Sequence, residues 1–273
     1  MEQAAKEFIH TVWKSKDFNT FPGPHPVSIE RKHLPLLKQN KYVVCEKTDG
    51  VRFMLLCFMY DGKKIALLVN RAFEMKQIGG LCIPRNTIVE GEMVDDKLFM
   101  IYDGNMVNGV DIQHMKYTER LKCIEPITKG PSVKIKLQMK TVWPISCIHK
   151  LEMIQFPYQT DGYVFTPEDE PVRMETHETM FKWKPLDRIT VDFKVIKVHD
   201  RIGLYVKDRD SYSFIQDFPY RDELVGKIVE CLYSNDQWNF VKIRNDKPQP
   251  NNRRTYFRTL VNIRENIQLS EFS

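Results

Sequence analysis

Residues 42–59 read YVVCEKTDGVRFMLLCFM, and this stretch decides the fold. The β-branched and aromatic residues on both sides of Asp49-Gly50 predict two strands, and Asp-Gly is a typical turn between them. The turn gathers Lys47, Asp49 and Arg52. Such a lysine could attack a phosphate if neighbouring positive charge or burial favoured its neutral amine. Alone, the stretch fits an ordinary hairpin turn with a solvated lysine equally well.

The composition indicates a soluble globular protein that stays inside the cell. The chain has 273 residues, 42% of them hydrophobic, which allows one large domain or two unequal ones. No apolar run approaches the ~20 residues of a membrane span, and residues 1–17 lack the apolar core of a signal peptide. The net charge of +5 is compatible with a nucleic-acid or nucleotide partner. The six scattered cysteines are expected to be reduced core residues.

The hydrophobic patterns predict an α+β fold in two domains. Residues 41–184 are mostly strand-like, with helices expected at 118–124 and at 146–154, the latter capped by Ser146. Five short strands then suggest a small barrel; they are 191–198, 202–207, 212–215, 227–233 and 238–244. We expect a larger domain over residues 1–188 and the barrel over 189–254. A helix within residues 255–273 is expected to pack back on the larger domain.

Acidic and aromatic residues recur at strand ends after the lysine turn. Glu90 and Glu92 are two residues apart on a predicted strand, so their side chains share a face that suits a divalent metal or ribose hydroxyls. Tyr102-Asp103 ends the next strand, where the aromatic ring could stack on a base. Asp161-Gly162 begins a later strand. Each pattern alone also fits a solvated strand face, a core aromatic or a plain turn.

Cationic side chains form two further groups. Strand alternation in Lys182-Trp183-Lys184-Pro185 places both lysines on one face, where an anion such as a triphosphate would relieve their repulsion. A strand-to-loop segment near the end of the barrel region carries Lys242, Arg244, Asp246 and Lys247. Alone, this segment fits a surface basic loop as well as a contact to leaving pyrophosphate.

Together and in this order, these motifs resemble the covalent nucleotidyltransferase superfamily, which contains mRNA capping guanylyltransferases and ATP-dependent polynucleotide ligases. The likeness covers residues 41–251. It is closer to the capping enzymes, because Asp161-Gly162 stands where ligases usually carry Glu-Gly. The resemblance implies a nucleotidyltransferase domain of antiparallel sheets followed by an OB-fold barrel.

The resemblance also implies a mechanism. Lys47 would attack the α-phosphorus of GTP, and the resulting lysine-linked GMP would pass to the 5′-diphosphate end of RNA to form a GpppN cap. Mg²⁺ or Mn²⁺ held near Glu92 and Asp161 would offset charge on the α-phosphate. The other roles implied by the resemblance are phosphate contact for Arg52, Lys182 and Lys184, support of the lysine loop for Asp49, ribose contact for Arg71 and Glu92, guanine stacking for Tyr102, guanine O6 recognition for Lys140, nucleotide binding for Asp161-Gly162, and closure over the triphosphate for Arg244, Asp246 and Lys247.

The sequence departs from the family pattern at two positions. Glu90 stands where the family more often has Asp, which keeps the charge. Lys242 stands where an arginine is usual, so its contact to pyrophosphate would lose the bidentate geometry of a guanidinium.

Two other readings remain open, an ATP-dependent RNA or DNA ligase using the same lysine and a noncatalytic RNA-end or polymerase-binding module. The capping reading implies RNA as a partner, with the RNA polymerase II C-terminal tail, a separate RNA triphosphatase and a cap methyltransferase. The capping reading implies no membrane as a partner. The location would be the nucleus, or the cytoplasm for a viral enzyme.

Overall fold

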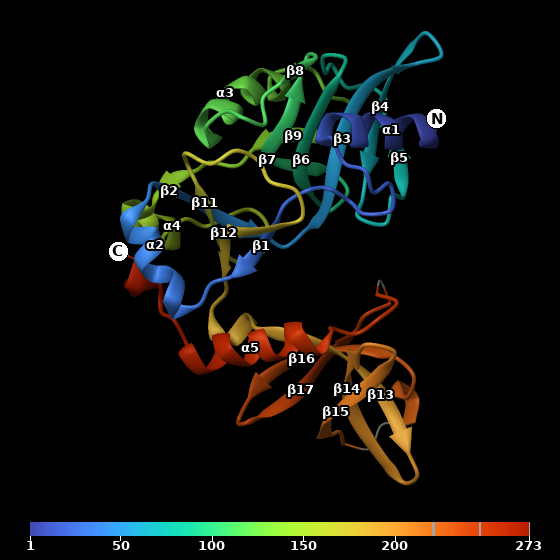
Figure 1. Cartoon of the computed structure of the whole chain (residues 1–273), viewed down its shortest axis with the longest axis vertical. Helices are drawn as coiled ribbons and strands as arrows, with labels where there is room; N and C mark the ends of the chain where they lie inside the picture. Colours follow the sequence, from blue (N-terminus) through green and yellow to red (C-terminus); the bar gives the residue numbers. More distant parts are fainter. Residues whose placement is uncertain (220–221, 246, 273) are drawn as a thin grey trace. The chain divides into compact units, whose positions relative to one another are not determined.

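A computed structural model describes residues 1–219, 222–245 and 247–272 (Figure 1). The contacts divide the chain into two compact units. Unit 1 comprises residues 1–27, 34–182 and 272–273, and unit 2 comprises residues 28–33 and 183–271. Both units combine helices with antiparallel sheets, so the fold is α+β, as the sequence predicts.

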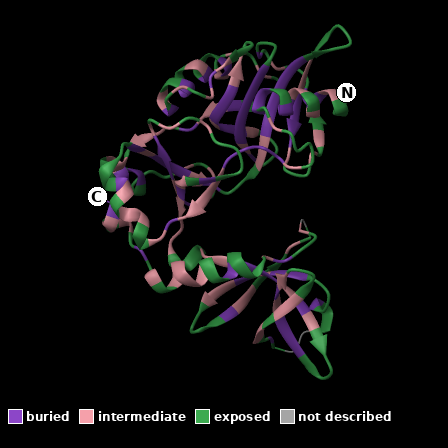
Figure 2. Ribbon diagram, in the orientation of Figure 1, coloured by how far each residue is buried: buried purple, intermediate pink, exposed green. Residues whose placement is uncertain are grey.

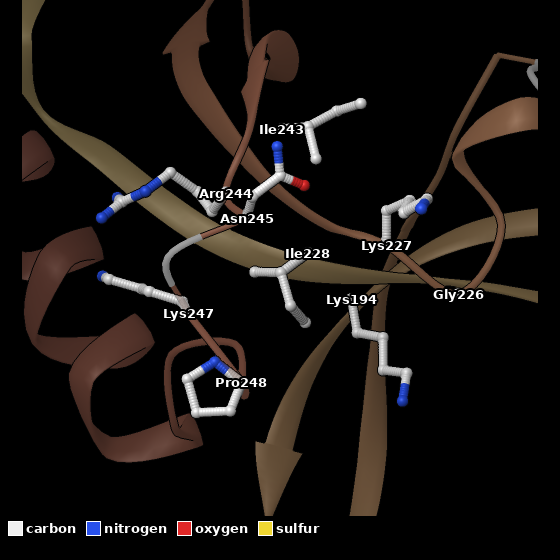
Figure 3. Close-up of a pocket in the computed structure, with 9 residues that line it drawn as sticks. All are labelled: Lys194, Gly226, Lys227, Ile228, Ile243, Arg244, Asn245, Lys247 and Pro248. Atoms are coloured by element: carbon white, nitrogen blue, oxygen red, sulfur yellow. The ribbon is translucent and has the colours of Figure 1, made fainter. Parts of the chain in front are cut away.

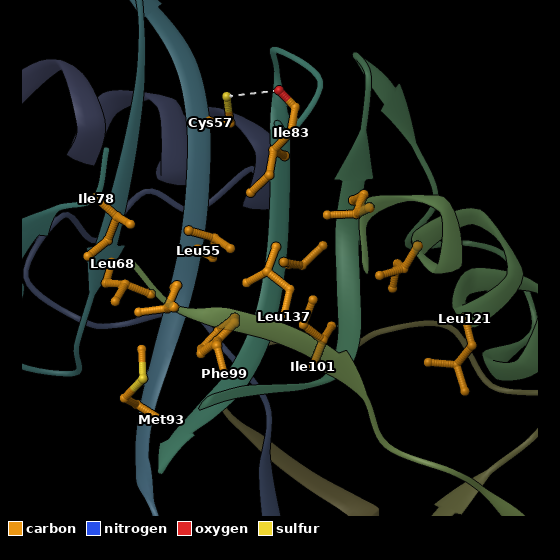
Figure 4. Packing of buried hydrophobic residues seen from close by; sticks show 14 of the residues in the cluster. Leu55, Cys57, Leu68, Ile78, Ile83, Met93, Phe99, Ile101, Leu121 and Leu137 are labelled. Carbon is orange, nitrogen blue, oxygen red and sulfur yellow. Dashed lines mark hydrogen bonds between the residues drawn. The ribbon is translucent and has the colours of Figure 1, made fainter. Parts of the chain in front are cut away.

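The larger sheet of unit 1 lies between two helices. Its strands run in the order β5 (Met75–Gln77), β4 (Lys63–Val69), β3 (Val51–Tyr60), β6 (Thr87–Val94), β7 (Leu98–Val107) and β8 (Val110–Asp111), and β9 (Lys136–Met139) pairs in parallel with β7. Because alternate residues of a strand face opposite ways, β3 supplies two cores. Leu55 packs with α3 (Tyr117–Thr128), and Met54 and Leu56 pack with α1 (Glu2–Trp13). Figure 4 shows the first of these cores, and Figure 2 the buried strands.

The second sheet of unit 1 carries the lysine strand. Its order is β1 (His25–Ser28), β12 (Thr176–Trp183), β11 (Thr160–Pro167), β2 (Tyr42–Thr48) and β10 (Trp143–Pro144). Short helices flank it, namely α2 (Leu34–Gln39), the 3-10 turn Ile145–Cys147 and α4 (Ile148–Glu152), whereas the 3-10 turn Arg31–His33 belongs to unit 2. The predicted Ser146 cap is wrong, because Ser146 lies inside the 3-10 turn and α4 begins after Cys147 without a side-chain cap.

Unit 2 is a five-stranded antiparallel sheet of the OB type. Its order is β15 (Ser211–Asp217), β14 (Arg201–Asp208), β13 (Thr190–Val198), β16 (Ile228–Ser234) and β17 (Gln237–Ile243). Among the described residues, backbone ladders leave the sheet open between β15 and β17. The Gln216 amide bridges these edge strands: Nε2 donates to the Trp238 carbonyl at 3.2 Å, and Oε1 accepts from the Trp238 N–H at 2.9 Å.

Helix α5 (Arg253–Glu265) belongs to this second unit. The Asn252 side chain caps it by accepting from the Thr255 N–H. Tyr256, Leu260 and Ile263 pack in the core of the barrel sheet. The expected packing of residues 255–273 on the larger domain therefore differs from the structure, in which only the chain end near Phe272 joins unit 1. The apolar stripe of a helix predicts that the helix packs against another element but not which one. In the structure, α5 packs on the five-stranded sheet of unit 2.

The 3-10 turns Leu186–Arg188, Asp222–Leu224 and Leu269–Phe272 complete the elements. No helix in the described part of the chain has the length and apolar character needed to cross a bilayer. Of the six cysteines, Cys45, Cys57 and Cys231 are buried as expected, but Cys82 is exposed and Cys123 and Cys147 are half-buried. The expectation of core cysteines is thus correct for three of them.

Candidate active site

Lys47 lies where the chain passes from one sheet of unit 1 to the other. Strand β2, which carries Lys47, pairs with β10 and β11, whereas β3 pairs with β4 and β6. Asp49-Gly50 is therefore a crossing between sheets and not the turn of an ordinary hairpin. The Asp49 N–H donates to the Gln159 carbonyl at 2.9 Å. This bond ties the lysine loop to the segment that leads into β11.

The Lys47 ammonium pairs with Asp161, its neighbour on β11. The distance from Nζ to Oδ1 is 2.9 Å, and both side chains are about one-fifth exposed. The pairing of β11 with β2 is interrupted between Thr160 and Tyr163, so the Asp161-Gly162 segment bulges. Gly162 has φ 136°, a conformation that disfavours residues with a Cβ. The Asp-Gly pair therefore has a local reason: glycine permits the bulge from which Asp161 reaches Lys47.

Arg52 is held at the centre of a buried polar cluster. Its guanidinium pairs with Glu90 on β6 and donates to the Pro24 carbonyl at 2.6 Å. Glu90 also accepts from the Tyr102 hydroxyl and the Asn105 amide, each at 3.3 Å. Glu90 thus fixes the phosphate-contact candidate Arg52.

Two arginines meet at one histidine nitrogen. Nδ1 of His25 on β1 lies 3.2 Å from the Arg52 guanidinium and 3.2 Å from that of Arg71. Burial together with the positive charges of Arg71, Arg52 and Lys182 lowers the pKa of His25 to about 4. His25 is therefore neutral at pH 7, and Arg52, Arg71 and Lys182 form one cationic cluster.

Lys140 lies in a second buried network beside this cluster. Its Nζ donates to the Glu46 carbonyl at 3.1 Å and to the Glu92 carboxylate at 3.4 Å, and it lies 5.7 Å from the centroid of the Tyr102 ring. Burial raises the pKa of the Glu46 carboxyl, against the opposing effect of Lys140. The Tyr158 hydroxyl donates to that carboxyl at 3.0 Å. Tyr102, Lys140 and Glu92, three of the four predicted base and ribose contacts, are therefore neighbours.

A buried ion pair between Arg120 and Asp103 lies next to Tyr102 in the sequence. The buried Arg120 guanidinium of α3 makes two hydrogen bonds to the Asp103 carboxylate, at 2.8 and 2.9 Å. The Tyr117 hydroxyl donates to the Tyr102 carbonyl at 2.7 Å. Asp103 thus anchors the middle of β7, where Tyr102 stands, and the prediction that Tyr102-Asp103 ends this strand is wrong because the strand continues to Val107.

Some predicted residues lie apart from this site. Among the described residues, the Asp49 carboxylate makes no hydrogen bond or ion pair, so its predicted role in the lysine loop is carried by its backbone. Strand β12 ends at Trp183, so the alternation argument reaches Lys182 but stops short of Lys184, which the contacts assign to unit 2.

The last motif lies wholly in unit 2. Arg244 and Lys247 both pair with the buried Asp192 carboxylate, Arg244 at 3.0 Å. Lys242 pairs with Glu230 at 3.3 Å instead. Asp246, the remaining residue of the predicted set, lies outside the described residues. Arg244 and Lys247 line a pocket of about 240 Å³, shown in Figure 3.

Sequence reasoning missed several members of these networks. His25, Glu46, Asn105, Arg120 and Tyr158 stand outside the recognised motifs, and their partners are far away in sequence. No local pattern could have found them. Only the pairing of β1 with β12 and of β2 with β11 brings His25 and Glu46 to the site.

The donor chemistry of the site fits a small divalent metal. Glu92 and Asp161 offer carboxylate oxygens, the ligands that Mg²⁺ and Mn²⁺ prefer. Within residues 1–219, 222–245 and 247–272, no group of three or more His, Cys, Asp and Glu side chains gathers as a metal site. A metal here would take its remaining ligands from water and substrate phosphates, as Mg²⁺ often does.

Two family models and several curated relatives match the chain. The family model described as "mRNA capping enzyme, catalytic domain" matches residues 1–186, and "mRNA capping enzyme, C-terminal domain" matches residues 163–272. The chain is 30% identical over 280 residues to an mRNA-capping enzyme of Danio rerio, covering 86% of this chain and 46% of that protein. It is 24% identical over 316 residues to the mRNA-capping enzyme subunit alpha of Schizosaccharomyces pombe, covering 91% and 78%.

The chain thus spans about half the length of the zebrafish relative. Among solved structures, a mycobacterial DNA ligase D complexed with ATP and MES matches with a TM-score of 0.50 and 10% identity, covering 85% of this chain and 97% of that one. At this identity the likeness supports the fold alone.

Proposed function

The chain belongs to the mRNA capping enzyme family, and on this premise we propose that it is a GTP:mRNA guanylyltransferase. It would transfer GMP from GTP, through a lysine-linked GMP, to the 5′-diphosphate end of RNA. The observation that carries the proposal is the 2.9 Å contact of Lys47 with Asp161 on the unit that holds Arg52, Arg71 and Lys182.

In the first half-reaction, the Lys47 nitrogen forms a bond to the α-phosphorus of GTP as the bond to the β-phosphate oxygen breaks. Pyrophosphate leaves with that oxygen. The amine must give up protons, and Asp161 is placed to accept one. The cluster of Arg52, Arg71 and Lys182 offsets the phosphate charge. A divalent metal held by Glu92 and Asp161 would supply further charge neutralisation at the α-phosphate.

In the second half-reaction, a terminal oxygen of the RNA diphosphate attacks the same phosphorus. The phosphorus–nitrogen bond breaks, Lys47 regains its proton and GpppN-RNA is released. Within unit 1, Tyr102 and Lys140 would contact the guanine, and Arg71 and Glu92 the ribose. Arg244, Asp246 and Lys247 of unit 2 would act on the triphosphate, with Lys184 as a further phosphate contact.

Labelling with α-³²P-GTP tests the proposal. Incubation with Mg²⁺ or Mn²⁺ should leave acid-labile label on the wild-type protein in a denaturing gel. Lys47→Ala and Lys47→Arg should remove it, and the arginine variant is the matched control because it keeps a cation beside Asp161. The proposal is wrong if the wild-type protein is not labelled, or if the label survives both substitutions.

An ATP-dependent ligase would use the same lysine chemistry, so it is the second function to test. Parallel incubation with α-³²P-ATP separates the two. A capping enzyme is labelled by GTP, whereas a ligase is labelled by ATP and joins nicked strands.

We further propose a separate RNA triphosphatase, a cap methyltransferase and the RNA polymerase II tail as partners, and the nucleus, or the cytoplasm for a viral protein, as the location. These follow from family membership and not from a feature of the site. Pull-down with phosphorylated tail peptides, and imaging of the tagged protein, test them. If the protein does not bind such peptides, the polymerase tail is not a partner.

A further inference from the structure

The outer face of the barrel sheet carries a cluster of aromatic and cationic side chains. Two cross-strand rows build it. Lys194 on β13 is in register with Tyr205 on β14, which is in register with Phe214 on β15. In the next row, Lys207 is opposite Tyr212. We call these five residues the β13–β15 face.

Strand alternation places this face away from the core. The sequence neighbours of Lys194 and Tyr205, namely Phe193, Val195, Leu204 and Val206, pack in the interior of unit 2. Phe214 is 51% exposed, and the other four members are half-buried. Clustered aromatic rings on a solvent-facing sheet surface indicate an interaction site.

Gly203 makes room for the rings. A Cβ at this position would lie 2.8 Å from the Phe214 ring and 3.0 Å from the Tyr205 ring. The two rings therefore lie over the backbone at Gly203 and meet edge to face, with centroids 5.5 Å apart. This packing fixes the rings in place, so a ligand that stacks on them would lose little side-chain entropy.

Within the described part of the chain, neither Lys194 nor Lys207 forms an ion pair with a carboxylate. Lys194 Nζ lies 4.8 Å, and Lys207 Nζ 4.9 Å, from the centroid of the same Tyr212 ring. The acid at the end of this strand, Asp208, pairs with Arg253 at 3.0 Å. Two ammonium groups around one ring favour an anion between or beside them.

The face adjoins the pocket of Figure 3. Lys194 is a member of both, and the pocket adds Lys227, Arg244 and Lys247. Arg244 and Lys247 already pair with Asp192, so Lys227 and Lys194 are the pocket cations that would contact RNA phosphates next to the aromatic rings. Rings for bases together with a line of cations for phosphates is the pattern of single-stranded nucleic-acid binding, and the second and third strands of OB folds commonly provide it.

We propose that the β13–β15 face binds the first nucleotides of the single-stranded RNA whose 5′ end receives the cap. The proposal rests on the guanylyltransferase function for the identity of the RNA. Bases stack on Phe214 and Tyr205, and Lys194 and Lys207 contact the backbone. The face thus holds the acceptor, a role distinct from GTP binding in unit 1.

Fluorescence anisotropy with a labelled 5′-diphosphate RNA of about 15 nucleotides tests this on the full chain. The variant Lys207→Ala/Phe214→Ala removes one cation and one exposed ring from the face. Its matched control is Phe257→Ala/Arg258→Ala on α5, which removes one cation and one ring that is 49% exposed. Thermal unfolding checks that both variants are folded.

We expect the face variant to bind RNA roughly 10- to 100-fold more weakly, as the loss of base stacking and a phosphate contact predicts. The control should stay within about 2-fold of wild type. An abasic phosphodiester chain of the same length has no bases to stack on the rings. The face variant should therefore bind this chain more weakly than wild type only by the effect of the lost Lys207 charge. Unchanged RNA affinity of the face variant, or an equal loss in the control, overturns the proposal.

GTP labelling, which involves no RNA, separates this proposal from the proposed function. A protein that is not labelled by GTP but loses RNA affinity in the face variant contradicts only the guanylyltransferase function. A protein that is labelled by GTP but keeps its RNA affinity in that variant contradicts only the RNA-binding face.

Discussion

Lys47 Nζ and Asp161 Oδ1 lie 2.9 Å apart across the paired strands β2 and β11. The bulge at Gly162 brings the carboxylate to this place. An acceptor so close to the nucleophile has a use beyond charge balance, because the attacking amine must lose protons. The contact therefore joins the lysine that precedes Asp49-Gly50 to the Asp161-Gly162 bulge in one chemical step.

Asp161→Asn keeps the shape of the side chain and removes its basicity. We expect the rate of lysyl-GMP formation to fall by about 10²-fold or more, as loss of a general base does. Single-turnover labelling with α-³²P-GTP measures this rate. Asp169→Asn is the control, since this carboxylate is exposed and pairs with Lys116. Labelling of Asp161→Asn at the wild-type rate would show that the carboxylate is dispensable.

Glu90→Gln leaves the Arg52 guanidinium buried without its ionic partner. Removing one member of a buried pair typically costs about 3–5 kcal/mol, so the urea midpoint of unit 1 should fall clearly. Asp96→Asn is the control. It breaks the exposed pair with Lys76 and should change stability by about 0–1 kcal/mol. Equal midpoints for the two variants would contradict the anchoring role of Glu90.

The elements of this fold were predictable where the sequence pattern is local. The strand predicted to carry Glu90 and Glu92 is β6, and the five strands predicted between residues 191 and 244 agree with the structure within a few residues. Helix α1 was not predicted, although Ala5, Ile9, Val12 and Trp13 recur at helical spacing; the sequence does not show that this face covers β3. Local pattern cannot reveal which surface a helix will cover, and the same limit applies to α5.

The site residues likewise divide into those that local motifs identify and those that only the fold reveals. Lys47, Arg52, Glu92 and Asp161 were identified from short motifs, because the chemistry needs these residue types beside turns and strand ends. Their supporting contacts are non-local: Glu46 with Tyr158, Asp103 with Arg120, and His25 with Arg71. Each depends on a strand pairing or a helix position that one sequence does not reveal.

The Gln216 bridge should stabilise unit 2. Gln216→Ala leaves the N–H and the carbonyl of Trp238 without their partners at the open edge of the sheet. An unsatisfied buried polar group costs about 1–3 kcal/mol, and unfolding followed by tryptophan fluorescence should show a loss of this size. Gln237→Ala, which alters an exposed glutamine on β17, is the control and should be close to neutral. A neutral Gln216→Ala would mean that the edge strands do not depend on the bridge.

His25 should make the protein sensitive to acid. Because both arginines can only donate, its Nδ1 must accept, which requires the neutral ring. Its folded-state pKa of about 4 is lower than the ordinary 6.5, so the unfolded chain binds more protons between these two values. The free energy of unfolding must then fall as the pH drops from 6.5 towards 4, and the contribution is fully present above 6.5.

His25→Gln keeps an acceptor for the arginines but does not titrate. Between pH 7.5 and 4.5, we expect wild type to lose on the order of 1–2 kcal/mol more than the variant, after allowance for solvent screening. Urea unfolding at the two pH values measures the difference. Other buried histidines with a lowered pKa, His10 and His177, titrate equally in both proteins and cancel. An equal acid-induced loss in the two proteins would mean that His25 is not held neutral by Arg52, Arg71 and Lys182.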